Sequence, residues 1–277
     1  MRLVTYRSER GDRAGVLWQG GVVDCWDAIG GGGSSVRALL EGDRLDDVAR
    51  AEGDVLPLAE VELLPPVPDP DKILCIGLNY RAHAAEAGLE PPETPTFFAK
   101  FRNALAAPGA AVPLPAASEK VDYEAEVAFV VGRRAKDVAE ADALDHLAGY
   151  MLFNDLSARD LQFATPQWMP GKVFDGSAPC GPALVTPDDA GAHDAISFAL
   201  TLNGAQMQAS STADLVFSIP RLIAHLSRLA TLEPGDIVAT GTPAGIGGAR
   251  EPRVWLRPGD EVLISSPELG RLETRLL

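Results

Sequence analysis

The sequence predicts a β-rich α+β protein with two domains, a small N-terminal α/β domain at residues 1–66 and a larger domain at residues 67–277. Two observations support the class: short apolar runs recur between Gly- and Pro-containing turns, and only a few segments have a helical pattern. The boundary follows from Pro65, Pro66, Pro68 and Pro70, because proline at this density continues neither a helix nor a central strand.

Composition excludes several classes of partner. The formal charge of −15 is spread without a basic block, which argues against nucleic acid and against an anionic membrane surface. Three cysteines lie far apart and form no disulfide or zinc pattern, as is typical of a reducing compartment. We find neither a signal peptide nor an apolar run long enough to cross a bilayer. We therefore expect a cytoplasmic protein without nucleic-acid or membrane partners.

The N-terminal domain reads as short strands followed by a helix. MRLVTY, GVLWQ and GVVDC are strand candidates, and SSVRALLE indicates a helix with a serine cap. The glycines at 30–33 match neither phosphate-loop spacing, so we interpret them as a connector.

The larger domain opens with the strand KILCIG and a helix over YRAHAAEA, which we expect Asn79 to cap and Gly88 to end. His83 and Glu86 lie three residues apart on one face of this helix. A carboxylate on one ring nitrogen orients an imidazole and raises its basicity, which suits proton transfer. The same spacing also occurs on plain solvated faces; glycines on both sides favour a hinged lid.

The stretch VDYEAEVAFVV, residues 121–131, is the most informative in the chain. Read as a strand, it places Glu124 and Glu126 on one face, and such neighbours repel unless a cation lies between them. A hard divalent cation is the natural partner. The alternative is an edge strand with a wet face, but the apolar continuation AFVV favours burial of both faces.

A third carboxylate, Asp155, follows the strand AGYMLFN and lies 29 residues beyond Glu126. One crossover, including a helix over AEADALDHL, would return the chain to an adjacent place in the sheet. Asp155 could equally cap the turn SARDLQ, and local sequence leaves both interpretations open.

Downstream segments add a lysine and several strands. The loop 163–182 is rich in Pro and Gly, and loops of this length are often functional. Lys172 is its only base and is either a surface residue or faces an anionic substrate.

Asn203-Gly204 indicates a hairpin, and FSIPRLIAHLSRLATLE indicates a helix. EPGDIVATG, RPGDEVLIS and RLETRLL are strand candidates. TGTPAGIGG misses nucleotide-loop spacing, but its Thr242 hydroxyl and amides could hold a carboxylate.

Six motifs occur in the order and spacing of the fumarylacetoacetate hydrolase family, which residues 72–277 strongly resemble: GLNYRAHAAE, DYEAE, LFNDLSARDLQ, GKVFDGSAPCGP, FSIPRLIAHLS and LEPGDIVATGTPAGIG. The likeness is to the acylpyruvate hydrolase and hydroxyheptadienedioate isomerase branch, and residues 1–66 match its small variable domain loosely. The resemblance implies a β-roll, a homodimer, and Mg²⁺ (with Mn²⁺ or Ca²⁺ as alternatives) at Glu124, Glu126 and Asp155.

The resemblance also implies residue roles. His83 with Glu86 would activate water on a mobile lid, Lys172 would be catalytic, and Arg159, Gln162 and Thr242 would lie near the substrate. Arg81 and Lys100 are further basic residues that could balance the negative charge of an oxo acid substrate.

The expected function is hydrolysis of a carbon-carbon bond in an acylpyruvate-like acid of the fumarylpyruvate or fumarylacetoacetate type, in aromatic compound catabolism. Decarboxylation of oxaloacetate and isomerisation of a hydroxymuconate or hydroxyheptadienedioate acid use the same polarised oxo acid and remain alternatives. A further alternative is an inactive, metal-stabilised binding protein. Lys172 argues against it, because a structural ion site has no use for a lysine opposite its acids.

Overall fold

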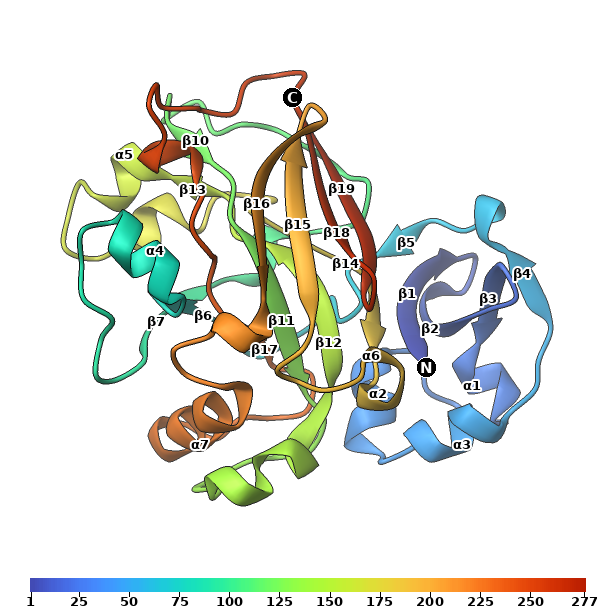
Figure 1. Cartoon of the computed structure of the whole chain (residues 1–277). Helices are drawn as coiled ribbons and strands as arrows, with labels where there is room; N and C mark the ends of the chain where they lie inside the picture. Colours follow the sequence, from blue (N-terminus) through green and yellow to red (C-terminus); the bar gives the residue numbers. More distant parts are fainter.

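The computed structural model describes all 277 residues and confirms the β-rich α+β class (Figure 1). The longest helix has only eleven residues, whereas strands occur along the whole chain. None of the helices combines the length and the apolar character needed to span a membrane.

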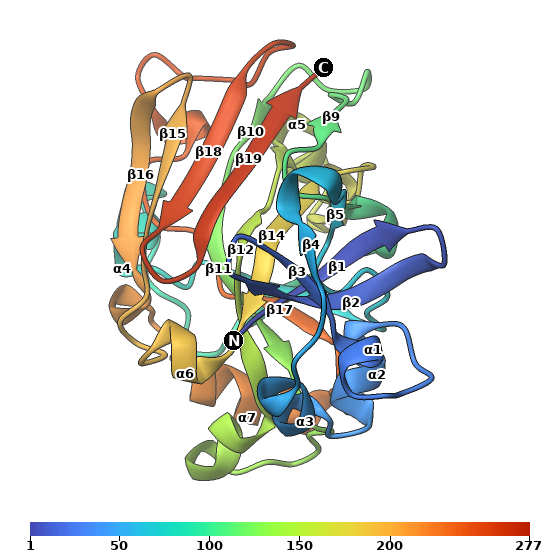
Figure 2. The same ribbon diagram turned by 90° about the vertical axis from the view of Figure 1, so that its right-hand side faces the viewer.

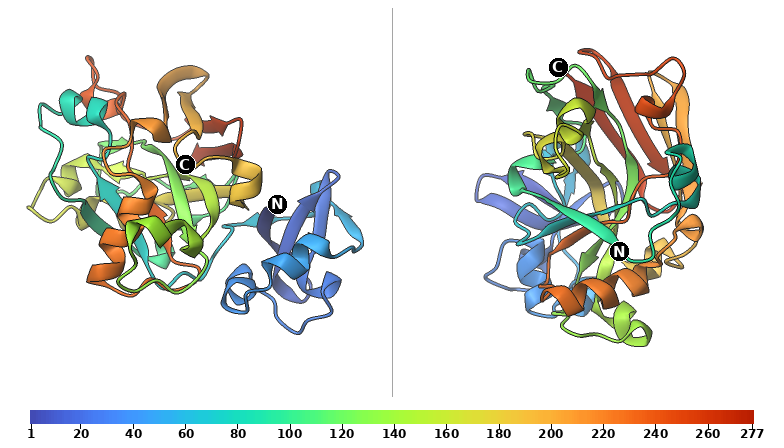
Figure 3. Two further views of the ribbon diagram at one scale, coloured as in Figure 1. Left: turned by 60° about the horizontal axis from the view of Figure 1, so that its bottom comes forward. Right: turned by 90° about the vertical axis from the view of Figure 1, so that its left-hand side faces the viewer.

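The N-terminal segment forms a lobe at one side of the molecule (Figures 1 and 3). Three short helices follow its first three strands, and the cap predicted for the second helix is confirmed, since the Ser35 side chain accepts from the Ala38 N–H. The elements are β1 (Arg2–Ser8), β2 (Gly11–Trp18), β3 (Gly21–Asp24), α1 (Cys25–Ala28), α2 (Val36–Glu41), α3 (Leu45–Arg50), β4 (Val55–Pro57), the 3₁₀ helix η1 (Leu58–Glu60) and β5 (Leu63–Leu64).

The first part of the larger segment supplies most of the strands around the candidate functional site. Its elements are β6 (Ile73–Gly77), α4 (Arg81–Glu86), β7 (Thr96–Lys100), η2 (Arg102–Ala104), β8 (Leu105–Ala106), β9 (Ala111–Val112), β10 (Val121–Asp122), β11 (Ala125–Val131), η3 (Glu140–His146), β12 (Leu147–Asn154), β13 (Ser157–Ala158), α5 (Arg159–Gln162), η4 (Met169–Gly171) and β14 (Ala178–Val185).

The C-terminal part adds a hairpin, the longest helix and the closing strands. The predicted Asn-Gly turn is confirmed, because Asn203 and Gly204 both have positive φ angles, 50° and 83°. The elements are α6 (Pro187–Ala190), β15 (Ser197–Leu202), β16 (Ala205–Ser211), η5 (Thr212–Asp214), α7 (Ile219–Leu229), β17 (Ile237–Ala239), η6 (Gly247–Ala249), β18 (Glu261–Ser266) and β19 (Gly270–Leu276).

Two larger sheets organise these elements. The first has twelve strands and follows the order β4-β3-β2-β1-β14-β12-β11-β17-β6-β7, with β5 beside β1 and β8 beside β14. The second follows the order β16-β15-β18-β19-β9 and stands over the first (Figure 2). Arg2 of β1 lies opposite Val185 of β14, so the first sheet runs from the N-terminal lobe into the rest of the chain. The division into domains at residue 66 stays a prediction.

Strand β11 lies at the centre of the first sheet, between β12 and β17, and both of its faces are buried. Val127 and Phe129 belong to one hydrophobic cluster, and Ala128 and Val130 belong to the other. The prediction from AFVV is therefore confirmed, and the edge-strand alternative is wrong. The expected continuous strand over 121–131 is interrupted at Tyr123 and Glu124, which separate β10 from β11.

Two local predictions are wrong because tertiary contacts replace local ones. Asn79 does not cap α4; its buried side chain instead donates to the carbonyls of Phe217 and Thr240 and accepts from the Phe217 N–H. The segment expected as a crossover helix is the 3₁₀ helix η3, and the strands on either side of it, β11 and β12, are antiparallel neighbours. A crossover is needed only between parallel strands, so the third acid reaches the first two by direct pairing.

A buried ion pair ties the N-terminal strands together. The Asp24 carboxylate accepts from the Arg13 guanidinium at 2.6 and 2.7 Å and from the Tyr6 hydroxyl at 2.7 Å. Burial raises the pKa of Asp24, but hydrogen bonds from Arg13, the Asp27 N–H and Tyr6 outweigh it and hold the pKa below its usual value.

We expect Asp24→Asn to lower the free energy of unfolding by about 3 kcal/mol at pH 7, because it removes the buried carboxylate charge that pairs with Arg13 and leaves the guanidinium only the half-exposed Asp27. The folded pKa of Asp24 lies below the unfolded one, so the contribution is present above about pH 4 and is lost as the pH falls further. The difference between variant and wild type in urea denaturation should therefore shrink at pH 3. Asp43→Asn is the control, because Asp43 pairs with Arg133 at the surface and does not contact Arg13; its effect on stability should be much smaller. An Asp24→Asn effect that is the same at both pH values would contradict this assignment.

Candidate functional site

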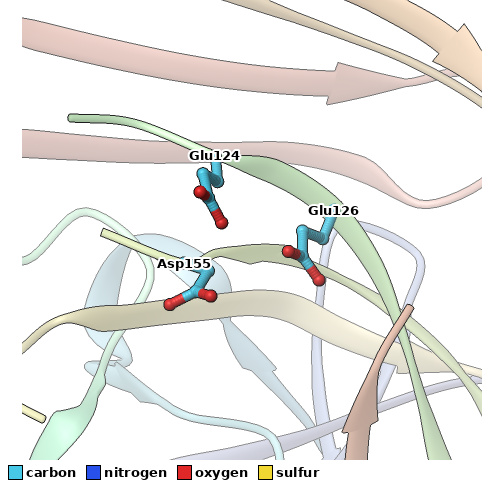
Figure 4. A group of neighbouring side chains, drawn as sticks. All are labelled: Glu124, Glu126 and Asp155. Carbon is cyan, nitrogen blue, oxygen red and sulfur yellow. The ribbon is translucent and has the colours of Figure 1, made fainter. Parts of the chain in front are cut away.

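Three carboxylates converge where β11 and β12 pair (Figure 4). Glu124 lies just before β11, Glu126 is its second residue, and Asp155 follows β12 directly. The ladder pairs Ala125 with Asn154, and the Asp155 N–H donates to the Glu124 carbonyl at 2.9 Å. One oxygen from each acid lies within 4.8 Å of the others, and all three residues are buried. Asp155 does not cap α5. Of the two interpretations that the local sequence left open, the position next to Glu124 and Glu126 is therefore the one that the structure shows.

Three basic side chains contact two of these acids. The Lys172 Nζ lies 2.9 Å from Glu124 Oε2 and 2.8 Å from Asp155 Oδ2. On the other side of Glu124, the Arg159 guanidinium reaches Oε1 at 2.6 Å. The Lys100 Nζ contacts Asp155 Oδ1 at 2.6 Å. All three bases are buried, so Lys172 is not the surface residue that local sequence left open.

The third acid, Glu126, has no basic partner. Burial raises the pKa of Glu126 well above its usual value, and the charges of Asp155 and Glu124 raise it further. Burial acts the same way on Glu124, but Lys172 and Arg159 outweigh it and lower the pKa of that carboxyl below its usual range. The cluster therefore lacks positive charge at Glu126. A hard divalent cation fits it, because carboxylate oxygens are the ligands that Mg²⁺, Mn²⁺ and Ca²⁺ prefer.

A fourth acid, Asp122 at the end of β10, was not among the expected site residues. Its carboxylate accepts from the Arg159 Nε at 2.9 Å, from the Gly247 N–H at 2.7 Å and from the Gly248 N–H at 2.9 Å. Asp122 thus fixes both Arg159 and the loop 240–248. Its position as the first residue of the DYEAE motif was the available signal, but its partners are distant in the chain.

The loop 240–248 holds a carboxylate that belongs to the protein. The Gly241 N–H donates to Glu126 Oε2 at 2.8 Å. The Thr242 hydroxyl donates to the Ala125 carbonyl at 2.9 Å and accepts from the Gln208 side chain. The sequence indicated that this loop could bind a carboxylate, and in the structure its amide binds Glu126.

Helix α4 carries His83 and Glu86, the predicted pair of histidine and carboxylate. His83 Nδ1 lies 3.3 Å from one Glu86 oxygen, and the Gly245 N–H donates to the other at 2.8 Å. His83 lines the same cavity as Glu124 and Glu126. The His83-Glu86 pair and the acid cluster therefore share one site.

A cavity of about 530 Å³ is lined by residues of helix α4 and of the acid cluster. It is lined by most of the residues that the sequence singled out: His83, Glu86, Glu124, Glu126, Arg159, Gln162, Lys172 and Thr242. Asp155 and Lys100 are buried beneath it, and Arg81 is exposed on α4 outside the lining. The structure thus brings together residues from six segments of the chain and leaves Arg81 apart.

Comparison with known proteins identifies the family. Residues 72–277 match the family described as Fumarylacetoacetate (FAA) hydrolase C-terminal. The chain belongs to the fumarylacetoacetate hydrolase family. This confirms the resemblance seen in the six motifs.

Family members with similar chains bear several names. The fumarylacetoacetate hydrolase domain-containing protein 2 homolog of Dictyostelium discoideum is 38% identical, covering 98% of this chain and 96% of that one. The mitochondrial oxaloacetate tautomerase FAHD2A of Homo sapiens is 41% identical over 84% of this chain and 76% of its own. The solved fumarylacetoacetate hydrolase of Exiguobacterium antarcticum is 30% identical with a TM-score of 0.86, covering 100% of this chain and 99% of that one. The fold of this family is thereby confirmed over the whole chain.

We expect MgCl₂ to raise the melting temperature, since an ion that binds only the folded state at 100 times its dissociation constant stabilises it by about 2.7 kcal/mol. Glu126→Gln should abolish this rise without destabilising the metal-free protein, because it removes a carboxyl that burial and two like charges disfavour. Asp160→Asn is the matched control: Asp160 lines the same cavity but is bonded to Ser118 and to neighbouring N–H groups. A full rise in the glutamine variant would contradict the assignment of Glu126.

Proposed function

We propose that this protein is a metal-dependent enzyme that interconverts the keto and enol forms of a small anionic 2-oxo acid, with oxaloacetate as the first substrate to test. The observation that carries the proposal is that an acid cluster short of positive charge shares one cavity with a His-Glu pair. The name of the human relative, an oxaloacetate tautomerase, supports the same reaction.

The charges at the site favour an anionic ligand once a cation is bound. Four buried carboxylates and three buried basic groups leave one net negative charge, and a divalent cation turns this into one net positive charge. The groups are Asp122, Glu124, Glu126 and Asp155, with Lys100, Arg159 and Lys172. Among these groups, Lys172 and Arg159 also line the cavity and can contact a substrate carboxylate or oxo group directly.

A bound divalent cation would supply Lewis-acid polarisation of the 2-oxo carbonyl. Glu86 holds Nδ1 of His83, which leaves Nε2 to take a proton from the carbon next to that carbonyl. Lys172 lines the same cavity and would stabilise and protonate the oxygen that gains charge, recovering its proton from the imidazolium through solvent. One proton leaves carbon, one arrives at oxygen, and no water is consumed.

Hydrolysis of a longer acylpyruvate-like acid is a second candidate, favoured by the size of the cavity. Its 530 Å³ exceed what a four-carbon acid fills, and Phe163, Trp168 and Trp255 contribute apolar walls. Lys120 and Arg253 also line it and have no acidic partner within 4 Å, so they could meet a second carboxylate. In this reaction His83 would take its proton from water. Decarboxylation and isomerisation of a diacid begin from the same polarised oxo acid.

An inactive binding protein is less well supported than either reaction. A scaffold that only held an ion would need the three acids, but would have no use for His83 and Glu86 across a cavity or for Lys172. The homodimer and the choice of Mg²⁺ stay predictions. The cytoplasmic location also stays a prediction, and several relatives are named as mitochondrial proteins.

We expect His83→Asn to lower kcat for oxaloacetate tautomerisation by about 10² to 10⁴, because it removes the base while leaving a side chain of similar size. Ultraviolet absorbance of the enol and proton NMR of the products would measure it, with acylpyruvates and muconate-type diacids in the same panel. Tautomerisation leaves the carbon skeleton intact, whereas hydrolysis releases pyruvate. Turnover of acylpyruvates without oxaloacetate tautomerisation would promote the second candidate. Equal rates for variant and wild type would contradict the role of His83.

We expect Lys172→Met to lower kcat by about 10² to 10³ while Mg²⁺ binding is retained, because the lysine contacts the two acids but supplies no ligand to the ion. Lys136→Met, which removes a surface lysine outside the cavity, is the control for oxaloacetate turnover. Calorimetry would measure metal affinity, and the ultraviolet assay the rate. If affinity and rate both survive in Lys172→Met, the lysine has no catalytic role.

A further inference from the structure

Each acid of the cluster has one oxygen held from outside by a donor of the protein. Its other oxygen either faces Lys172 or has no hydrogen-bond partner. The three holding contacts are Arg159 to Glu124 Oε1 at 2.6 Å, the Gly241 N–H to Glu126 Oε2 at 2.8 Å, and Lys100 to Asp155 Oδ1 at 2.6 Å.

Lys100 differs from the other two donors in its place. It is the last residue of β7, its side chain is fully buried, and it does not line the cavity. Its Nζ contacts Asp155 Oδ1 and, at 3.4 Å, the Leu156 carbonyl. Lys100 therefore contacts Asp155 without lining the cavity, whereas Lys172 contacts the same carboxylate and lines it.

We propose that Lys100 is a positioning residue that keeps Asp155 a one-oxygen ligand and thereby sets which cation the site prefers. Both oxygens of Asp155 are bonded to an ammonium: Lys172 lines the cavity and would turn toward a bound substrate to release Oδ2, whereas Lys100 does not line the cavity and keeps Oδ1. Three single oxygens suit the six-coordinate Mg²⁺, which keeps its remaining positions for water or substrate. Ca²⁺ takes six to eight oxygens and commonly uses both oxygens of a carboxylate. The inference rests on the proposed metal-dependent function.

A purely electrostatic role for Lys100 predicts something different. Removing a positive charge beside three carboxylates would tighten the binding of Mg²⁺ and Ca²⁺ alike and leave their ratio unchanged. Release of Asp155 Oδ1 would instead favour Ca²⁺ selectively, because only the larger ion gains a ligand. The ratio of the two dissociation constants separates the two roles.

The test is calorimetric titration of the metal-free full chain with MgCl₂ and with CaCl₂, for wild type and Lys100→Met. We expect the preference for Mg²⁺ over Ca²⁺ to fall by about tenfold in the variant, the lower end of the range for partners of metal ligands. Lys72→Met is the matched control: Lys72 also pairs with a buried aspartate, Asp236, at 2.8 Å but lies outside the cluster. Its ratio should stay at the wild-type value.

If Lys100→Met does not fold, a structure of the wild-type protein crystallised with MnCl₂ tests the proposal instead. We expect one oxygen of Asp155 on the ion and the other still on Lys100. Both oxygens on the ion, or an unchanged ratio in a folded Lys100→Met, would overturn the role of Lys100 alone. Wild type that binds neither ion would overturn the metal-dependent function and this inference with it.

Discussion

The structure depends on the compensation of like charges that are buried at one place. Glu124, Glu126 and Asp155 lie within reach of one ion, and an ionised carboxylate left unpaired in the interior is strongly unfavourable. Lys100 and Lys172 come from separate segments of the chain to meet these acids. Stability of the core and assembly of the site therefore depend on the same contacts, and Glu126 is the acid at which a cation could complete the charge balance.

The glycine-rich loop 240–248 is the second point on which the site depends. Its backbone N–H groups hold three acids from three segments: Gly241 binds Glu126, Gly245 binds Glu86, and Gly247 with Gly248 binds Asp122. Gly245 has a φ of 103°, and a Cβ there would lie 2.3 Å from a backbone oxygen, so this position needs glycine. One loop thus connects the acid cluster to the helix that carries His83.

Predictions from short-range patterns succeeded where the partners are close in sequence. The Ser35 cap and the Asn203-Gly204 turn depend on residues within one turn of chain. Asn79 failed because partners about 140 and 160 residues away, Phe217 and Thr240, satisfy its side chain better than a helix end does. Asp122 was missed for the same reason, since the donors that tie it to the site, Arg159 and Gly247, lie more than thirty residues away.

The sequence by itself determined the β-rich class, the family and the three acids of the centre, because periodicity and ordered motifs are local properties that the chain carries before it folds. Only the tertiary structure decided that β11 and β12 pair antiparallel, and which base holds which oxygen. A donor that is displaced by about an ångström loses its hydrogen bond, so its exact position decides which of the two carboxylate oxygens it bonds. Distances of that size between remote segments are set by the packing of whole strands, which no local pattern encodes.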